Sequence, residues 1–167
     1  MTVKKLTRCA VLVALALALS VAEGLVPLTI LFPLPGLRLG LANLVTVYVL
    51  VTMGAGEAVM ILLVRCFLGA LLGGNLSSLA FSLTGGLLAF GVEALLLHCK
   101  SLSLFGVCIA GAAGHNTGQI MASIVMMKTP ATLVYLPPLL MASLLTGAFT
   151  GWVAALLLRR LPAGRIS

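Results

Sequence analysis

The chain has 167 residues, of which 62% are hydrophobic and 8% are charged. A soluble domain carries about 25% charged residues, so this chain has too little polar surface to fold as one. Its net charge of +7 arises from ten basic residues against three acidic ones, without the dense basic patch typical of nucleic-acid binding. Because a membrane helix needs about 20 apolar residues, the chain holds five or six spans and no soluble catalytic domain.

Long apolar segments continue along the chain to its end. A basic start at residues 1–8 precedes the first segment, at about residues 9–22. The same pattern also fits a cleaved signal peptide, which would leave a scaffold of five helices. Residues 23–40 contain Pro27, Pro33 and Pro35, which exclude one straight helix and predict an irregular loop. Further spans are predicted at about residues 41–53, 57–72, 77–97, 102–127 and 133–158. The expected fold is therefore an all-α integral membrane protein: one domain over residues 1–167, a bundle of six transmembrane helices.

Basic residues set the orientation of this bundle. Cytoplasmic loops of membrane proteins carry an excess of Lys and Arg. Two basic residues, Arg38 and Lys128, fall on the side opposite the termini. On the side of the termini lie Lys4, Lys5, Arg8, Lys100, Arg159, Arg160 and Arg165. We therefore expect a multi-pass protein of the cell membrane with both termini in the cytoplasm and a Pro-rich extracytoplasmic first loop.

Catalytic machinery is scarce in this sequence. It contains no Asp, and its three carboxylates are Glu23, Glu57 and Glu93. No Gly-x-x-x-x-Gly-Lys-[Ser/Thr] loop is present to bind nucleotide phosphates. The four cysteines lack the paired spacing of a metal site. We therefore expect neither an enzyme nor a resident cofactor or metal.

Polar groups within the predicted spans are costly in hydrocarbon, which makes them informative. Arg65 and Glu93 lie at compatible depths in the third and fourth spans. They are predicted either to form a structural ion pair, directly or through a polar neighbour, or to contact a ligand. In the fifth span, His115, Asn116 and Gln119 form either interhelical hydrogen bonds or one wall of a pocket. A lone histidine is a weak metal ligand, so no metal is expected at His115.

Two further features point to binding. The first loop ends with Arg38 and Asn43 at the expected mouth of the pocket, where Arg38 can pair with Glu23, face lipid headgroups or hold an anionic ligand group. The first span carries a ridge of small residues at four-residue steps, which favours close helix packing within the chain or docking of another membrane protein. The ridge comprises Ala10, Ala14, Ala18 and Ala22.

Three segments together resemble one family: Pro35-Gly36-Leu37-Arg38-Leu39-Gly40-Leu41-Ala42-Asn43, Ser82-Leu83-Thr84-Gly85-Gly86 and Gly111-Ala112-Ala113-Gly114-His115-Asn116-Thr117-Gly118-Gln119. It is the heptaprenyl diphosphate synthase component I family, or Gx transporter family. That family is in turn similar to the substrate-binding S components of energy-coupling factor (ECF) transporters. The latter similarity implies six helices, a ligand bound from outside, and docking through an alanine-rich first helix.

The two family names imply different functions. A prenyl diphosphate synthase holds diphosphate through magnesium, which needs carboxylate oxygens, and a chain with no Asp and three scattered Glu cannot build such an acid-rich clamp. The leading hypothesis is therefore a substrate-binding subunit of an ATP-driven uptake system in the lipid bilayer. Its partners would be a membrane coupling subunit, ATPase subunits and a vitamin-, cofactor- or isoprenoid-like ligand. The alternative is a non-catalytic membrane partner of prenyl or quinone synthesis, or of a membrane redox system. The predicted ligand contacts are Arg38, Asn43, Arg65, His115, Asn116 and Gln119.

Overall fold

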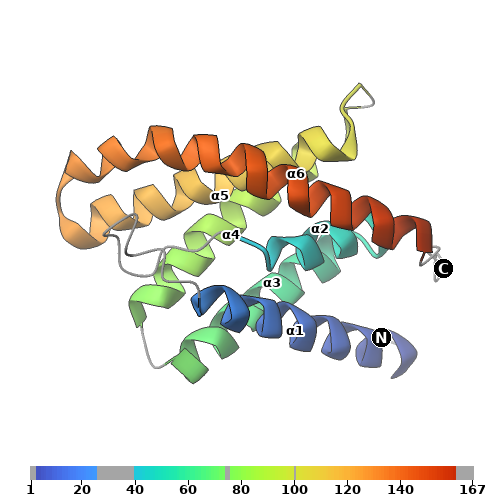
Figure 1. The fold of residues 1–167 in the computed structure, drawn as a ribbon. Helices are drawn as coiled ribbons and strands as arrows, with labels where there is room; N and C mark the ends of the chain where they lie inside the picture. The colour runs from blue at the N-terminus through green and yellow to red at the C-terminus, as the bar shows by residue number, and fades with distance from the viewer. Residues whose placement is uncertain (1–2, 26–39, 74–75, 100, 161–167) are drawn as a thin grey trace.

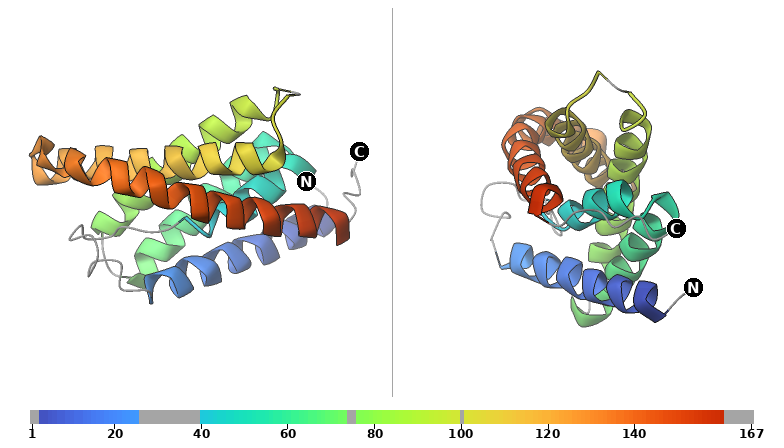
Figure 2. Two further views of the ribbon diagram at one scale, coloured as in Figure 1. Left: turned by 45° about the horizontal axis from the view of Figure 1, so that its top comes forward. Right: turned by 90° about the vertical axis from the view of Figure 1, so that its right-hand side faces the viewer.

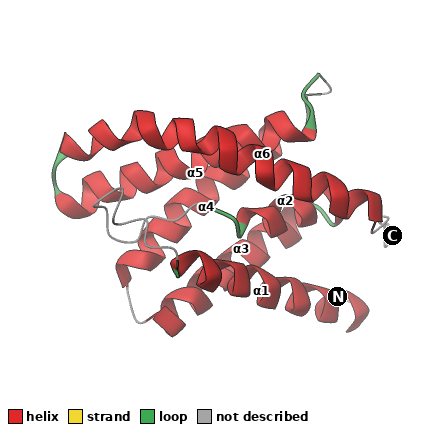
Figure 3. Ribbon diagram, viewed as in Figure 1, coloured by secondary structure: helices red, strands yellow, loops and turns green. Residues whose placement is uncertain are grey.

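A computed structural model describes residues 3–25, 40–73, 76–99 and 101–160. Across these residues the protein is all-helical, and the described part contains no strand (Figure 3). The elements are α1 (Val3–Gly24), α2 (Asn43–Thr52), α3 (Ala55–Gly73), α4 (Leu76–Leu96), α5 (Leu104–Met127), the 3-10 helix η2 (Pro130–Tyr135) and α6 (Leu136–Arg160). Most of the Pro-rich first loop, including Arg38, lies outside the described residues.

Local sequence explains where several helices begin and end. The Ser103 side chain accepts a hydrogen bond from the amide of Gly106 and so caps the start of α5. Lys128, at a φ of 51°, ends α5 in the left-handed conformation. Gly54, at a φ of 116°, allows the tight turn between α2 and α3. Pro130 starts η2, where a missing amide hydrogen costs little.

In the part of the chain that the structure describes, four helical segments are long and apolar enough to cross a membrane: α1, α3, α4 and the continuous run from Pro130 to Arg160. These segments are compatible with a multi-pass membrane protein. Helix α5 has 24 residues but carries the polar His115–Gln119 stretch and is not among the four. Helix α2 has 10 residues, or about 15 Å at 1.5 Å per residue, which is half of a hydrocarbon core about 30 Å thick. The six-span bundle therefore stays a prediction.

Helix α5 lies at the centre of one half of the molecule, packed along α4 on one side and α6 on the other (Figure 1). In the other half, α1 packs against α3 and α2, and a buried cluster around Tyr48 and Ile61 fills the space between them. The start of α1 and the end of α6 lie at the same end of the bundle (Figures 1 and 2).

Glycines bring the backbones of α4, α5 and α6 together. A Cβ atom added at Gly118 would lie 2.5 Å from the carbonyl oxygen of Thr84 in α4. A Cβ atom at Gly147 of α6 would lie 2.5 Å from Cα of Ile109 in α5. Both distances are too short for any side chain, so close helix packing requires glycine at these two positions.

Candidate ligand-binding core

Polar side chains are buried along the inner face of every α-helix, although an apolar bundle needs none of them. Such groups are expensive in a membrane unless they are hydrogen-bonded, so their positions point to a structural network or a binding site. The principal ones are Ser20 and Glu23 in α1, Asn43 and Thr46 in α2, Arg65 in α3, Glu93 in α4, His115, Asn116 and Gln119 in α5, and Thr150 in α6.

Arg65 connects three helices. Its side chain is 4% exposed, and Nη1 donates a hydrogen bond to Oγ of Ser20 in α1 at 3.2 Å. Nη2 donates to Oδ1 of Asn43 at the start of α2, at 2.9 Å. The head group also lies beside Gly86 of α4, where an added Cβ atom would be 3.4 Å from Nη2. Two of the predicted ligand contacts, Asn43 and Arg65, therefore touch each other.

The turn before α2 brings His115 to the same place. Gly40 has a φ of 85°, and a Cβ atom on it would lie 3.1 Å from Cδ2 of His115 and 3.3 Å from Nδ2 of Asn43. Glu23 fixes this turn, since its Oε1 accepts a hydrogen bond from the amide of Leu41 at 2.7 Å. Among the described residues, Asn43, Arg65 and His115 thus converge on one turn, which we call the polar turn (Gly40–Asn43).

Asn116 and Gln119, the other two predicted contacts of α5, pack against two different helices. Nδ2 of Asn116 donates to the carbonyl oxygen of Leu139 in α6 at 2.8 Å, which is an interhelical hydrogen bond. Gln119 is fully buried, and its side chain packs against Gly85 of α4, as does the ring of His115. His115 and Gln119 therefore occupy the α4–α5 seam, whereas Asn116 ties α5 to α6.

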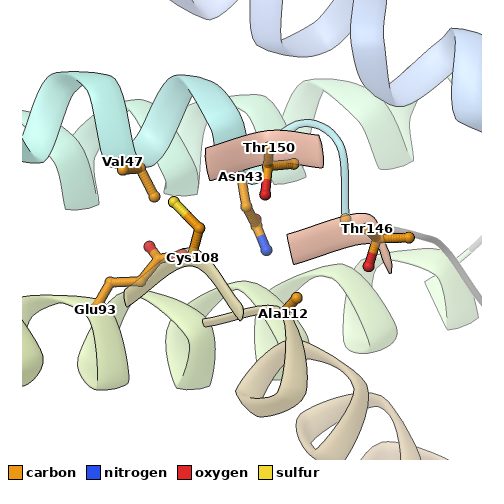
Figure 4. Close-up of a pocket in the computed structure, with 8 residues that line it drawn as sticks. Asn43, Val47, Glu93, Cys108, Ala112, Thr146 and Thr150 are labelled. Carbon is orange, nitrogen blue, oxygen red and sulfur yellow. The ribbon is translucent and has the colours of Figure 1, made fainter. Parts of the chain in front are cut away.

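Glu93 is 2% exposed and lies against α5, where only a residue without a side chain leaves room for its carboxylate. That residue is Gly111, whose added Cβ atom would overlap the carboxylate. Glu93 also lines a small cavity together with Asn43, Cys108 and Thr150 (Figure 4). An Arg65–Glu93 salt bridge is not among the ion pairs within the described ranges, but Asn43 binds Arg65 and shares this cavity with Glu93. Pairing through a polar neighbour stays a prediction.

Sequence reasoning did not assign Ser20, Cys108 or Thr150 to the site. Ser20 is three residues before Glu23, so both lie on one face of α1, and this spacing could have identified Ser20. Cys108 and Thr150 carry no comparable signal. They reach the cavity only because of how α5 and α6 pack.

The alanine ridge faces outward. Ala10, Ala14, Ala18 and Ala22 are exposed, whereas the buried face of α1 consists of Cys9, Ala16, Ser20 and Glu23. The ridge therefore lies on the side of α1 that does not pack against this chain.

The sequence profile of a family described as "Heptaprenyl diphosphate synthase component I" matches residues 12–157. No curated protein and no solved structure gives a significant match.

Proposed function

The chain belongs to the heptaprenyl diphosphate synthase component I family, and on that premise we propose that it is a non-catalytic membrane subunit that captures a small molecule for an ATP-driven uptake system. The family name implies a component that works with a partner, and the long apolar helices are compatible with a place in the membrane. The finer role in uptake is supported by the polar turn and by the outward alanine ridge.

The polar turn is the observation that carries the proposal. A buried arginine costs about 2.5–3.5 kcal/mol on insertion scales, which a passive membrane anchor has no reason to bear. Here the guanidinium of Arg65, the amide of Asn43 and the ring of His115 meet where α2 starts inside the bundle. The guanidinium of Arg65, which Asn43 holds in place, and the ring of His115 suit a ligand with an anionic or carbonyl group and an apolar remainder, such as a vitamin, a cofactor precursor or an isoprenoid-related compound.

Mass spectrometry of the purified protein tests this proposal. We expect a small molecule to remain bound to the wild type and to be lost from Asn43→Leu, which removes a polar group of the turn. Thr117→Ala is the matched control. It also removes a polar side chain, but the Thr117 hydroxyl donates its hydrogen bond to the carbonyl oxygen of Ala113 in the same helix. Equal retention by Asn43→Leu and the wild type, with both folded, would place the ligand elsewhere.

The ridge supports the partners that we propose, a membrane coupling subunit and ATPases. Ala14→Leu and Ala18→Leu should abolish co-purification of these subunits without lowering the melting temperature, because both positions are exposed. Val11→Leu, an exposed change one position off the ridge, is the control. Unchanged co-purification in the ridge variants would contradict docking through α1.

A second candidate function follows from the family description: a non-catalytic membrane partner of prenyl or quinone synthesis. A membrane redox system is a related possibility for the partner. Affinity purification from native membranes separates the candidates. Recovery of a prenyl synthase in place of ATPases would favour the second one. N-terminal sequencing of the same sample shows whether the first helix is retained or cleaved.

A further inference from the structure

The small cavity beside Glu93 lies between α2, α4, α5 and α6 (Figure 4). Its volume is about 10 Å³. A single water molecule needs roughly 10–15 Å³, so the cavity is matched to one water and is far too small for an organic ligand. The cavity is thus a site of the size of one water molecule and not a substrate pocket.

Two buried polar atoms in residues that line this cavity have no hydrogen-bond partner among the described parts of the chain. They are Nδ2 of Asn43 and Oε2 of Glu93, in residues that are 6% and 2% exposed. Buried polar atoms in native proteins are nearly always paired with protein or with ordered water. The cavity therefore offers a hydrogen-bond donor and a carboxylate oxygen to a small polar group bound inside it.

The orientation of the Asn43 side-chain amide determines which small group can bind in the cavity. Its Oδ1 accepts from Arg65, so its NH2 group is the end left to pair in the cavity. A metal cation requires oxygen ligands and would be repelled by this NH2 group. Water accepts from Asn43 and donates to Glu93. The hydroxyl of Thr150 donates to the carbonyl of Gly147, which leaves its oxygen able to accept from the same water.

We infer that this cavity binds one ordered water that bridges Nδ2 of Asn43 and Oε2 of Glu93. The bridge completes a path from Ser20 and Arg65 through Asn43 to Glu93. It joins the α1–α3 half of the bundle to the α4–α6 half. The inference goes beyond the proposed function, since the bridge is present whether the chain serves uptake or prenyl synthesis.

A structure of the purified wild type at a resolution that shows ordered water tests the inference directly. We expect one density peak within hydrogen-bond distance of both atoms, with no anomalous signal after soaking in thallium(I), a probe for monovalent cations. A thallium signal at that position would overturn the inference in favour of a cation site. Absence of any peak would overturn it as well.

A cycle of substitutions provides a second test that needs no structure. Ala112 lines the cavity, so Ala112→Val fills it and displaces the water. We expect a lower melting temperature than for Ala113→Val, the same change on the next residue, which does not line the cavity. In a Glu93→Met background, where no carboxylate needs the water, Ala112→Val should cost much less. An equal loss in both backgrounds would indicate overpacking alone and would contradict the bridge.

Discussion

Asn43 uses both ends of its amide at the centre of the bundle. Its oxygen holds the guanidinium of Arg65 and its nitrogen lies in the cavity of Glu93. A leucine or an aspartate at this position would keep the approximate size but lose one or both of these roles. The position therefore requires a side-chain amide, which has both an acceptor and a donor, and another polar side chain of similar size would not replace it.

We predict that Arg65 and Glu93 stabilise the folded protein as a coupled pair. Removing one member of a buried charge pair costs about 3–5 kcal/mol, because the other charge is left without compensation. We expect Arg65→Leu and Glu93→Leu each to lower the stability of the detergent-solubilised protein. The double variant should recover part of the loss, since no charge remains. Thermal unfolding of the four proteins measures the coupling.

Strictly additive losses in the double variant would show that the two residues do not interact. If stability returns but the bound small molecule does not, the pair also contributes to ligand binding. Arg65→Leu carries a further cost of its own, because Ser20 and Asn43 lose a donor.

Helix α5 shows how glycine positions set the packing of whole elements. Gly118 contacts the backbone of α4, and Gly147 of α6 contacts the backbone of α5. Side chains at these positions would push neighbouring helices apart and disturb the seam that holds His115 and Gln119. The seam is therefore a property of three helices together.

Alanine substitutions test this packing. We expect Gly118→Ala and Gly147→Ala each to destabilise the protein by about 1–3 kcal/mol, the usual cost of overpacking. Gly91→Ala is the matched control, because an added Cβ atom there meets nothing within 4 Å. It should be neutral or stabilising by up to about 1 kcal/mol, since alanine favours helix. Thermal unfolding in detergent measures all three, and an unchanged Gly118→Ala variant would contradict close α4–α5 packing.

Hydropathy alone located most helices closely, because long apolar runs have few alternatives, but α1 begins at Val3 rather than at about residue 9, and α6 at Leu136 rather than at about residue 133. Helices α3, α4 and α5 begin and end within two residues of the expected segments. The site was less accessible to sequence reasoning. The spacing of Arg65 on α3 predicts a buried charge, but not that Ser20, 45 residues earlier, accepts its hydrogen bond. The outward direction of the alanine ridge also depends on which face of α1 packs, and the repeat alone does not decide that.

At the scale of the whole molecule, the prediction concerns orientation. The positive-inside rule predicts that both termini lie in the cytoplasm. Reporter fusions at residue 100 and residue 128 should report cytoplasm and exterior, respectively. Alkaline phosphatase and a fluorescent protein read the two sides independently. An external signal at residue 100 with an internal signal at residue 128 would contradict this topology.

The shortness of α2 has an electrostatic consequence. A ten-residue helix is about 15 Å long, half of a hydrocarbon core about 30 Å thick, so α2 is too short to cross a membrane. The N-terminus of a helix carries about half a positive charge and backbone amides without helical partners. The structure places the carboxylate of Glu23 against the amide of Leu41, just ahead of that end. The start of this short helix thus acts as a fixed dipole inside the bundle, and Glu23 supplies its counter-charge.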